Sequence, residues 1–369
     1  MKIVFLTRID SFSKFGGDTY QLQMYKKELE KKGHVIEIAN NLNVPSGFDF
    51  YIIVNLDRPL EFIIYYNKLK KMNLLNKTLI LSIHHSYEQI NFYENNYRKG
   101  LQQLILNMNN NFHSREKIKN LFRGLLNRKL FKYAFTQFFL NVKKIQRESI
   151  ERSSIIAIAE GEIKEIEKDY QVTVKKFGIV KNGVNLIEDV KNIQQPQRDI
   201  EILVAGRIEP RKNTLSVAEY FKDKKIKVCF VGGLNENFSE YTAQFEKIVG
   251  ASDHLEYLGK VTPDEMRNLY LRSKIHLSCS WFEVASLVDL EAYAYGCHTI
   301  SSQFGHTKDY LNDRIFYINP NHMEVLDEMI QQLLSKDNDI NTQFNFISEN
   351  YTWKMSTQSL EKYLKEFNA

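Results

Sequence analysis

Two glutamates, Glu283 and Glu291, have seven residues between them near the start of a predicted helix. On a helix, this spacing places the carboxylates about 80° apart around the axis and about 12 Å apart along it. The N–H groups of the first turn, expected from Ala285 to Val288, and the positive end of the helix dipole favour a phosphate. Taken alone, such a pair is more commonly an acid at a helix start and a solvated carboxylate. The chemistry to test is a diphosphate held between two carboxylates.

A group of cations follows an apolar run, residues 200–205, that predicts a buried strand. The run ends in Gly206 and Arg207, and Lys212 follows five residues later. A glycine turn that brings cations to the carboxyl end of a strand is what a nucleotide diphosphate requires. A solvated basic turn is the alternative.

Gly16 and Gly17 stand between a strand-like run at residues 3–6 and a helix-like stretch at residues 18–32. A phosphate can bind such a loop, but Gly-Gly is a weaker signal than G-x-G-x-x-G. Taken alone, the pair more commonly forms a turn that needs small residues.

His84 and His85 follow another strand-like run, residues 78–83. Side chains just beyond the carboxyl end of a parallel strand face the ligand crevice of an α/β fold. A histidine in this position is otherwise a capped or solvated residue, so both interpretations stay open.

Short apolar runs alternate with helical stretches along both halves of the chain, which predicts an α/β fold with parallel sheets. A length of 369 residues suits two domains. A polar, proline-containing segment at 192–199 is typical of a linker. We therefore expect one domain over residues 1–190 and a second over residues 199–350.

The composition is that of a globular protein, with 43% hydrophobic and 26% charged residues. The three cysteines are widely spaced, which indicates a reducing compartment and argues against structural zinc. No stretch is long and apolar enough for a signal peptide or a membrane-spanning helix. The D-x-D at 337–339 lies in a polar stretch and is expected to be a solvated loop. We expect a cytoplasmic protein with no metal, no other cofactor and no nucleic-acid partner.

Residues 98–152 carry thirteen Lys or Arg against three Glu, a balance of +10 in a chain of net charge +5. The segment lacks proline and predicts long helices. Phe131, Phe135 and Phe139 recur at every fourth position, so they either enter a membrane interface or pack on the sheet. Charge runs usually form solvated faces, but this imbalance favours contact with an anionic membrane surface. An anionic soluble glycan is the alternative.

The segment from Glu283 to Gly296 resembles the signature of the retaining glycosyltransferases of family 4, in which two glutamates with seven residues between them precede Ala-x-Ala-x-Gly. Where that family has Phe-Gly-Leu, this chain has Ala285, Ser286 and Leu287, and serine still offers a backbone N–H to a phosphate.

Other motifs extend the resemblance over nearly the whole chain. Gly206, Arg207 and Lys212 match the family's Gly-Arg-x-x-x-x-Lys, and residues 82–85 resemble its Thr-x-His-Asp. Residues 182–184 resemble the Asn-Gly-Val that closes its first domain.

The resemblance implies the GT-B fold: two Rossmann-like domains facing each other across a cleft, with a C-terminal helix, residues 352–369, crossing back to the first domain. It implies a metal-independent hexosyltransferase that moves a sugar from a nucleotide-diphosphate sugar to a glycan or lipid-linked acceptor. Bacterial surface polysaccharide or glycoconjugate synthesis, at the inner face of the cell membrane, is the expected setting.

The resemblance also implies roles for individual residues. Arg207 and Lys212 would bind the diphosphate, and Glu291 the ribose. Glu283 and His84 would contact the sugar. The expected catalytic residues are Glu283, His84, Arg207 and Lys212. The expected donor-binding residues are Gly16, Gly17, Arg207, Lys212, Lys260, Val261, Glu283, Ala285, Ser286, Leu287 and Glu291.

Three alternative functions share parts of this pattern. A dinucleotide-dependent oxidoreductase also has Rossmann-like halves, but no G-x-G-x-x-G follows the first strand of either half. A non-catalytic partner subunit would keep the fold, and measurable donor hydrolysis would exclude it. A phosphorylase or a sugar-nucleotide epimerase would also use a phosphate or diphosphate site.

Overall fold

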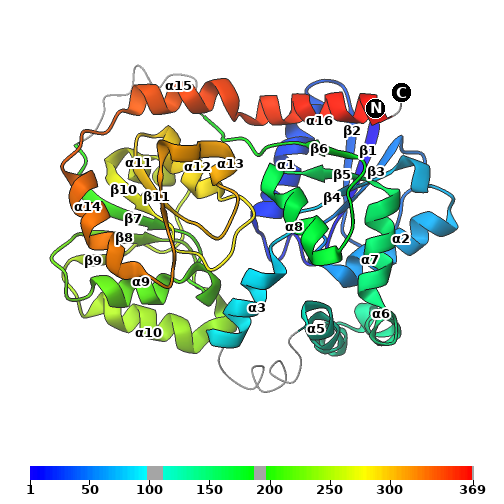
Figure 1. Cartoon of the computed structure of the whole chain (residues 1–369), viewed down its shortest axis with the longest axis horizontal. Coiled ribbons are helices and arrows are strands. Elements are labelled where there is room, and N and C mark those ends of the chain that lie inside the picture. The colour runs from blue at the N-terminus through cyan, green and yellow to red at the C-terminus, as the bar shows by residue number, and fades with distance from the viewer. Residues whose placement is uncertain (98–110, 187–196, 368–369) are drawn as a thin grey trace. The chain divides into compact units, whose positions relative to one another are not determined.

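The structure is a computed structural model that describes residues 1–97, 111–186 and 197–367. The chain divides into two compact units, one formed by Met1–Asn182 and Trp353–Ala369 and the other by Gly183–Thr352. The division thus falls at the Asn-Gly pair, about ten residues before the linker expected at 192–199. Most of that linker lies outside the described residues. Each unit contains one six-stranded parallel sheet with helices around it (Figure 1).

The sheet of the first unit has the order β2-β1-β3-β4-β5-β6, and every pairing in it is parallel. Its strands are β1 (Lys2–Leu6), β2 (Val35–Ala39), β3 (Phe50–Val54), β4 (Thr78–Leu81), β5 (Ser154–Ala157) and β6 (Phe177–Ile179). The strands are short apolar runs because helices cover both faces of such a sheet. The strand order reverses between β1 and β3, and ligands of open α/β sheets bind at such a switch point.

The helices of the first unit include the C-terminal one. In the described residues they are α1 (Gly17–Glu30), α2 (Pro59–Lys71), α3 (Tyr87–Asn96), α5 (Phe112–Leu126), α6 (Arg128–Phe138), α7 (Val142–Arg152), α8 (Glu160–Tyr170) and α16 (Trp353–Phe367). Helix α16 packs on α1 (Figure 1). The ring of Trp353 meets those of Tyr20 and Tyr25 edge to face, at 5.8 and 5.9 Å. Burial of this aromatic cluster joins the end of the chain to the first unit.

The sheet of the second unit has the order β12-β11-β10-β7-β8-β9, again with parallel pairings throughout. Its strands are β7 (Ile200–Ala205), β8 (Val228–Val231), β9 (Leu255–Tyr257), β10 (Ser273–Leu277), β11 (His298–Ser302) and β12 (Phe316–Ile318). This is the Rossmann order, and its switch point lies between β7 and β10.

The helices of the second unit pack on the two faces of this sheet. They are α9 (Thr214–Phe221), α10 (Ser239–Gly250), α11 (Pro263–Arg272), α12 (Leu287–Ala294), α13 (Lys308–Leu311), α14 (Leu326–Leu334) and α15 (Ile340–Asn350). Two successive residues of β7 face different cores. Ile202 packs in one core with Phe221, and Leu203 packs in the other with Leu269. The period-2 alternation of a strand therefore produces both cores.

Candidate functional site

Three strand ends of the second unit meet through glycines. Gly232, just after β8, has φ +140°, and a Cβ on it would lie 2.0 Å from the carbonyl oxygen of Gly206. The N–H of Gly232 donates to the carbonyl of Gly259 beyond β9 at 2.8 Å. Only glycine allows this approach of backbones. The close contact brings the predicted donor-binding residues Lys260 and Val261 near the loop that carries Arg207.

The cationic loop after β7 contains three basic side chains and one buried acid. Glu209, whose side chain is 6% exposed, pairs with Arg211 at 3.2 Å and with Arg207 at 3.4 Å. Burial would raise the pKa of Glu209, but Arg211 and Arg207 outweigh it and hold that pKa below its usual value. Glu209 therefore stays ionised and orients the two guanidinium groups.

Glu283 joins this cluster from the loop that follows β10. Its carboxylate pairs with the Arg211 guanidinium at 2.9 Å and accepts a hydrogen bond from the Lys212 ammonium. The predicted residues Glu283 and Lys212 are thus side by side at the switch point. Arg211, which was not among the predicted site residues, connects Glu209 to Glu283.

Backbone hydrogen bonds fix the position of the Glu283 loop. The N–H of Trp281 donates to the carbonyl of Arg211, and that of Glu283 to the carbonyl of Phe304, both at 2.9 Å. A Cβ on Gly305 would lie 3.0 Å from the Glu283 carbonyl oxygen, so this second loop also approaches closely. The carboxylate is therefore held on a fixed backbone rather than on a mobile turn.

The expectation that Glu283 and Glu291 share one helix is wrong. Helix α12 begins at Leu287 with Ser286 as its N-cap residue, so only Glu291 is helical. The predicted separation of the two carboxylates does not apply. The first-turn N–H groups also begin at Leu287, about two residues later than expected. Of the predicted phosphate-binding residues, Ala285 belongs to the preceding loop and Ser286 to the cap.

The predicted ribose ligand Glu291 lies one turn inside α12. It accepts a hydrogen bond from the hydroxyl of the buried Tyr270 at 3.2 Å. Burial raises the pKa of Glu291 to about 7, and the Tyr270 hydrogen bond offsets this only in part. A carboxyl group with a pKa near neutrality is poised to ionise when hydroxyl donors reach it.

In the first unit, an ion-pair network organises the loop after β1. Arg8, only 8% exposed, pairs with Asp18 at 2.8 Å and with Asp10 at 2.9 Å. Asp10 also pairs with Arg58, which follows β3, at 3.1 Å. The network links the loops on both sides of the switch point. The predicted donor-binding glycines lie at its edge: Gly16 is the N-cap residue of α1 and Gly17 its first residue.

His84 is completely buried between two carboxylates. Its Nδ1 lies 2.8 Å from Asp57 and its Nε2 2.9 Å from Asp169. Burial would lower the pKa of His84, but the two aspartates raise it to about 10. A contact between His84 and a sugar would require one of these ion pairs to break. The neighbouring His85 is 21% exposed, and its Nδ1 lies 2.7 Å from Asp57.

We expect replacement of His84 by asparagine to destabilise the first unit by about 3 kcal/mol, because it leaves Asp57 and Asp169 buried without their shared cation. The pKa of His84 is raised from 6.5 to about 10. Its stabilising effect is therefore complete below about pH 6.5 and is lost as the pH rises through 10.

Melting temperatures measured from pH 6 to 10 test this prediction. The wild type should lose stability over this range, and the variant should lose less of it. His298→Asn, which removes a half-buried histidine without a carboxylate partner in the described chain, is the control. Equal slopes for the wild type and His84→Asn would contradict the prediction.

A buried acid, Glu162, supports this end of β4 and was not found from the sequence. Its carboxylate accepts hydrogen bonds from the Ser82 hydroxyl at 2.6 Å and from the His84 N–H at 2.7 Å. Its other oxygen accepts from the N–H of Ile158 at 2.7 Å. Glu162 follows β5 at the start of a charged helix, where an acid is ordinarily a solvated first-turn residue. No local signal distinguishes the two roles.

Among the described residues, no cluster of three or more His, Cys, Asp or Glu side chains is placed to hold a metal ion. Asp339, of the D-x-D, accepts a hydrogen bond from the N–H of Thr342 and so caps α15. In the described ranges, no helix is long and apolar enough to cross a bilayer.

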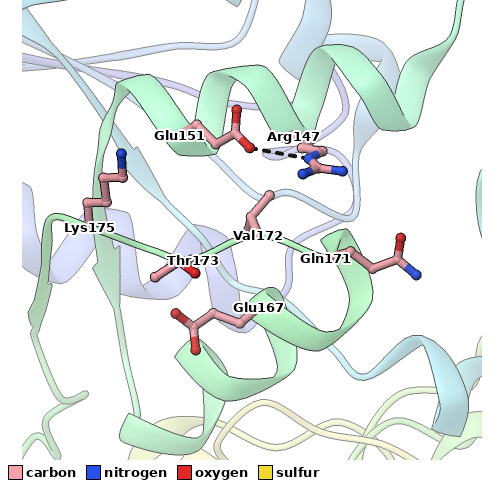
Figure 2. A pocket seen from close by; sticks show the side chains of 7 residues that line it. All are labelled: Arg147, Glu151, Glu167, Gln171, Val172, Thr173 and Lys175. Carbon is pink, nitrogen blue, oxygen red and sulfur yellow. Dashed lines mark hydrogen bonds and ion pairs between the residues drawn. The ribbon is translucent and has the colours of Figure 1, made fainter.

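A separate hollow of about 680 Å³ lies in the first unit between α7 and the segment after α8 (Figure 2). Arg147 and Glu151 form an ion pair at 3.2 Å along one wall. The hollow is lined by Arg147, Glu151, Glu167, Gln171, Val172, Thr173 and Lys175. None of the predicted site residues contributes to it, so the candidate site does not extend there.

Comparisons with solved structures find the same fold over the whole chain. Sucrose-phosphate synthase from Thermosynechococcus elongatus is 11% identical with a TM-score of 0.72, covering 100% of this chain and 99% of that one. Anabaena HepE in complex with UDP and glucose is 12% identical with a TM-score of 0.58, covering 99% of both chains. WaaG, a glycosyltransferase involved in lipopolysaccharide biosynthesis, is 14% identical with a TM-score of 0.57, covering 100% of both chains.

These similarities confirm the predicted GT-B fold class, and at such identities they show the fold alone. No curated protein matches the chain. The family model described as glycosyl transferases group 1 matches residues 161–353, which is more than half of the chain. That range includes the cationic loop after β7, the Glu283 loop and α12. The chain therefore belongs to the group 1 glycosyl transferases.

Proposed function

We propose that the protein is a retaining glycosyltransferase of family 4 whose donor is a nucleotide-diphosphate sugar. The observation that carries the proposal is the cluster at the switch point of the second unit. There, Arg211 and Lys212 meet Glu283 beside the N-terminus of α12. Arg207, 48% exposed and held weakly by Glu209, completes a set of three cations against two acids. A diphosphate suits this excess of positive charge.

The proposed chemistry follows from the charge of the leaving group. When the bond between the sugar and the diphosphate breaks, its electron pair stays on the phosphate oxygen and negative charge accumulates there. The ammonium and guanidinium groups, together with the first-turn N–H groups of α12, stabilise that charge in the transition state. We assign Glu283, which is held among these cations, to the sugar hydroxyls, and Glu291 to the ribose. Backbone groups at Lys260 and Val261 are the proposed contacts of the base.

We expect activity to survive a strong chelator, since side chains rather than a metal neutralise the leaving group. Turnover measured after exhaustive treatment with EDTA should stay within about twofold of the untreated value. Complete loss that Mg²⁺ restores would contradict metal independence.

The donor is best identified by ligand-dependent stabilisation. A ligand at a hundred times its Kd raises the free energy of unfolding by about 2.7 kcal/mol. UDP is the first nucleotide to test, because it is bound in the structure of Anabaena HepE. We expect UDP or another nucleoside diphosphate to raise the melting temperature, and its hexose conjugates to be hydrolysed slowly without an acceptor. Stabilisation without any hydrolysis would assign the chain to the non-catalytic subunits.

The acceptor is proposed to be a glycan or a lipid-linked saccharide of a bacterial surface polysaccharide or glycoconjugate, reached at the cytoplasmic face of the membrane. The involvement of WaaG in lipopolysaccharide biosynthesis supports this class of acceptor. The described part of the basic segment, residues 111–152, supports it independently, because its surface chemistry suits an acidic lipid surface.

A further inference from the structure

Helices α5 and α6 expose an unusual concentration of apolar side chains. Of the eighteen large apolar side chains that are exposed in the described residues, eight lie between residues 122 and 139. Leu126 is 90% exposed, Phe139 72% and Leu125 65%. We name as the hairpin face the seven residues Phe122, Leu125, Leu126, Phe131, Phe135, Phe138 and Phe139. Exposed apolar patches of this kind mark interaction sites.

Helices α5 and α6 form a helical hairpin, which is attached to the rest of the first unit through a different side of α6. The stripe of α6 that is buried consists of Leu130, Ala134 and Gln137. The Gln137 side-chain amide donates to the carbonyl of Pro59 at the start of α2 at 2.8 Å. A Cβ on Gly124 would lie 3.0 Å from that of Ala134, so α5 and α6 cross closely (Figure 1). The packing of α6 on the unit therefore leaves its phenylalanines outside.

The phenylalanines of α6 form one continuous surface. The ring centroids of Phe131 and Phe135 are 6.3 Å apart, those of Phe135 and Phe139 5.3 Å, and those of Phe139 and Phe138 5.6 Å. The sequence left open whether Phe131, Phe135 and Phe139 pack on the sheet. Their exposed fractions of 44%, 54% and 72% exclude that packing in the described structure.

The charged residues of this part of the described chain are almost all basic. Glu116 is the single acidic residue between 111 and 146; it is 5% exposed and pairs with Lys119 at 2.7 Å and with Arg123 at 3.7 Å. Arg128, Lys129 and Lys132 of α6 are all exposed. On a helix, Arg128 and Lys132 fall beside the stripe of Phe131 and Phe135. An apolar centre thus has a cationic border.

We propose that the hairpin face inserts into the interface of a bilayer that contains acidic lipid. Aromatic and leucine side chains of such a helix enter the boundary of the acyl chains, while flanking Lys and Arg bind anionic headgroups. A second copy of this chain is a poorer occupant, because it would bring two cationic borders together without an acidic partner. The inference deepens the proposed function by naming the surface at which the acceptor is met.

Binding to vesicles tests the proposal without any sugar transfer, so its failure is distinct from failure of the glycosyltransferase function. Co-sedimentation is measured with vesicles of phosphatidylcholine alone and with about one third phosphatidylglycerol, from low salt to about 0.5 M NaCl. The wild type should bind only the acidic vesicles. Part of this binding should persist at high salt, because screening weakens the ionic contribution and leaves the apolar one.

Two triple variants separate these contributions. L125S/L126S/F139S removes the three most exposed apolar side chains and should lower vesicle affinity on the order of a hundredfold, with loss of the salt-resistant fraction. R128Q/K129Q/K132Q should lower it by a similar factor at low salt. The control variants V35S/M72S/V325S and K70Q/K225Q/K247Q alter the same number of exposed apolar or basic side chains elsewhere and should bind like the wild type. Circular dichroism and melting temperatures check that all four variants fold.

A fluorescent probe reports insertion directly. All three native cysteines are buried, so L126C can be labelled selectively with an environment-sensitive dye. Its emission should shift to the blue with acidic vesicles and stay unchanged with neutral ones. Unchanged emission with both, or wild-type affinity in folded L125S/L126S/F139S, would overturn the proposal. So would a stable dimer in solution that this variant abolishes, because the face would then belong to a second copy.

Discussion

Replacement of Lys212 by alanine is expected to lower the turnover of donor sugar on the order of a hundredfold. The Lys212 ammonium shares the Glu283 carboxylate with Arg211, in the cluster where the leaving diphosphate is proposed to lie. Its loss removes a fixed positive charge that faces negative charge developing in the transition state. The effect should therefore fall mainly on kcat. Arg207→Ala should act in the same direction.

Steady-state kinetics with the donor identified by thermal shift provide the measurement. Lys225→Ala is the matched control, since Lys225 is an exposed lysine of the same unit. Melting temperatures exclude a folding defect. Near-normal turnover in both Lys212→Ala and Arg207→Ala would remove the basis for the diphosphate assignment.

Several strands were predictable from short apolar runs. The run at 200–205 coincides with β7, the run at 3–6 lies within one residue of β1, and the run at 78–83 lies within two residues of β4. Helices on both faces of a parallel sheet make its strands apolar throughout, so each strand stands out locally. The cations after β7 were placed correctly for the same reason, because the end of a buried strand fixes where the next loop begins.

The position of Glu283 was not predictable from spacing alone, although a signal for the start of α12 was present. Ser286 and Asp289 form the Ser-x-x-Asp pattern that marks the first turn of a helix. Read in that way, the pattern puts Glu283 before the helix. Asp289 itself does not complete a cap. It is buried and accepts hydrogen bonds from His276 at 3.0 Å and Ser301 at 2.5 Å.

The partners of His84 were beyond local inference. Asp57 and Asp169 lie 27 and 85 residues away along the chain and reach the ring from loops and helices beyond β3 and β5. The sequence shows two adjacent histidines after a strand and gives no reason for one to be buried. Only the assembled sheet determines that His84 is enclosed and that His85 is the more exposed of the two.

Glu283 and Glu291 are expected to respond differently to replacement, because they are assigned to different ends of the donor. Glu283→Ala should lower sugar transfer by ~10²–10³. It should leave the affinity for free nucleoside diphosphate intact or tighter, since it releases Arg211 and Lys212 from their acidic partner. Glu291→Ala should weaken that affinity about tenfold or more, because a carboxylate acceptor for the ribose hydroxyls is lost.

The pH dependence of nucleoside diphosphate binding gives this assignment a second readout. Burial places the pKa of Glu291 at about 7 in the absence of ligand, and hydroxyl donors favour its ionised form. Affinity should therefore rise as the pH rises through 7 in the wild type, and it should rise less in Glu291→Ala. Ionisation of the ligand itself contributes equally to both proteins, so the difference in slope isolates Glu291. Calorimetric titrations of nucleoside diphosphate from pH 6 to 8 measure this difference in slope. Glu256→Ala, which alters an exposed glutamate, is the control. Equal losses of nucleotide affinity in Glu283→Ala and Glu291→Ala, or parallel pH profiles for wild type and Glu291→Ala, would show that the two carboxylates do not divide the donor between them.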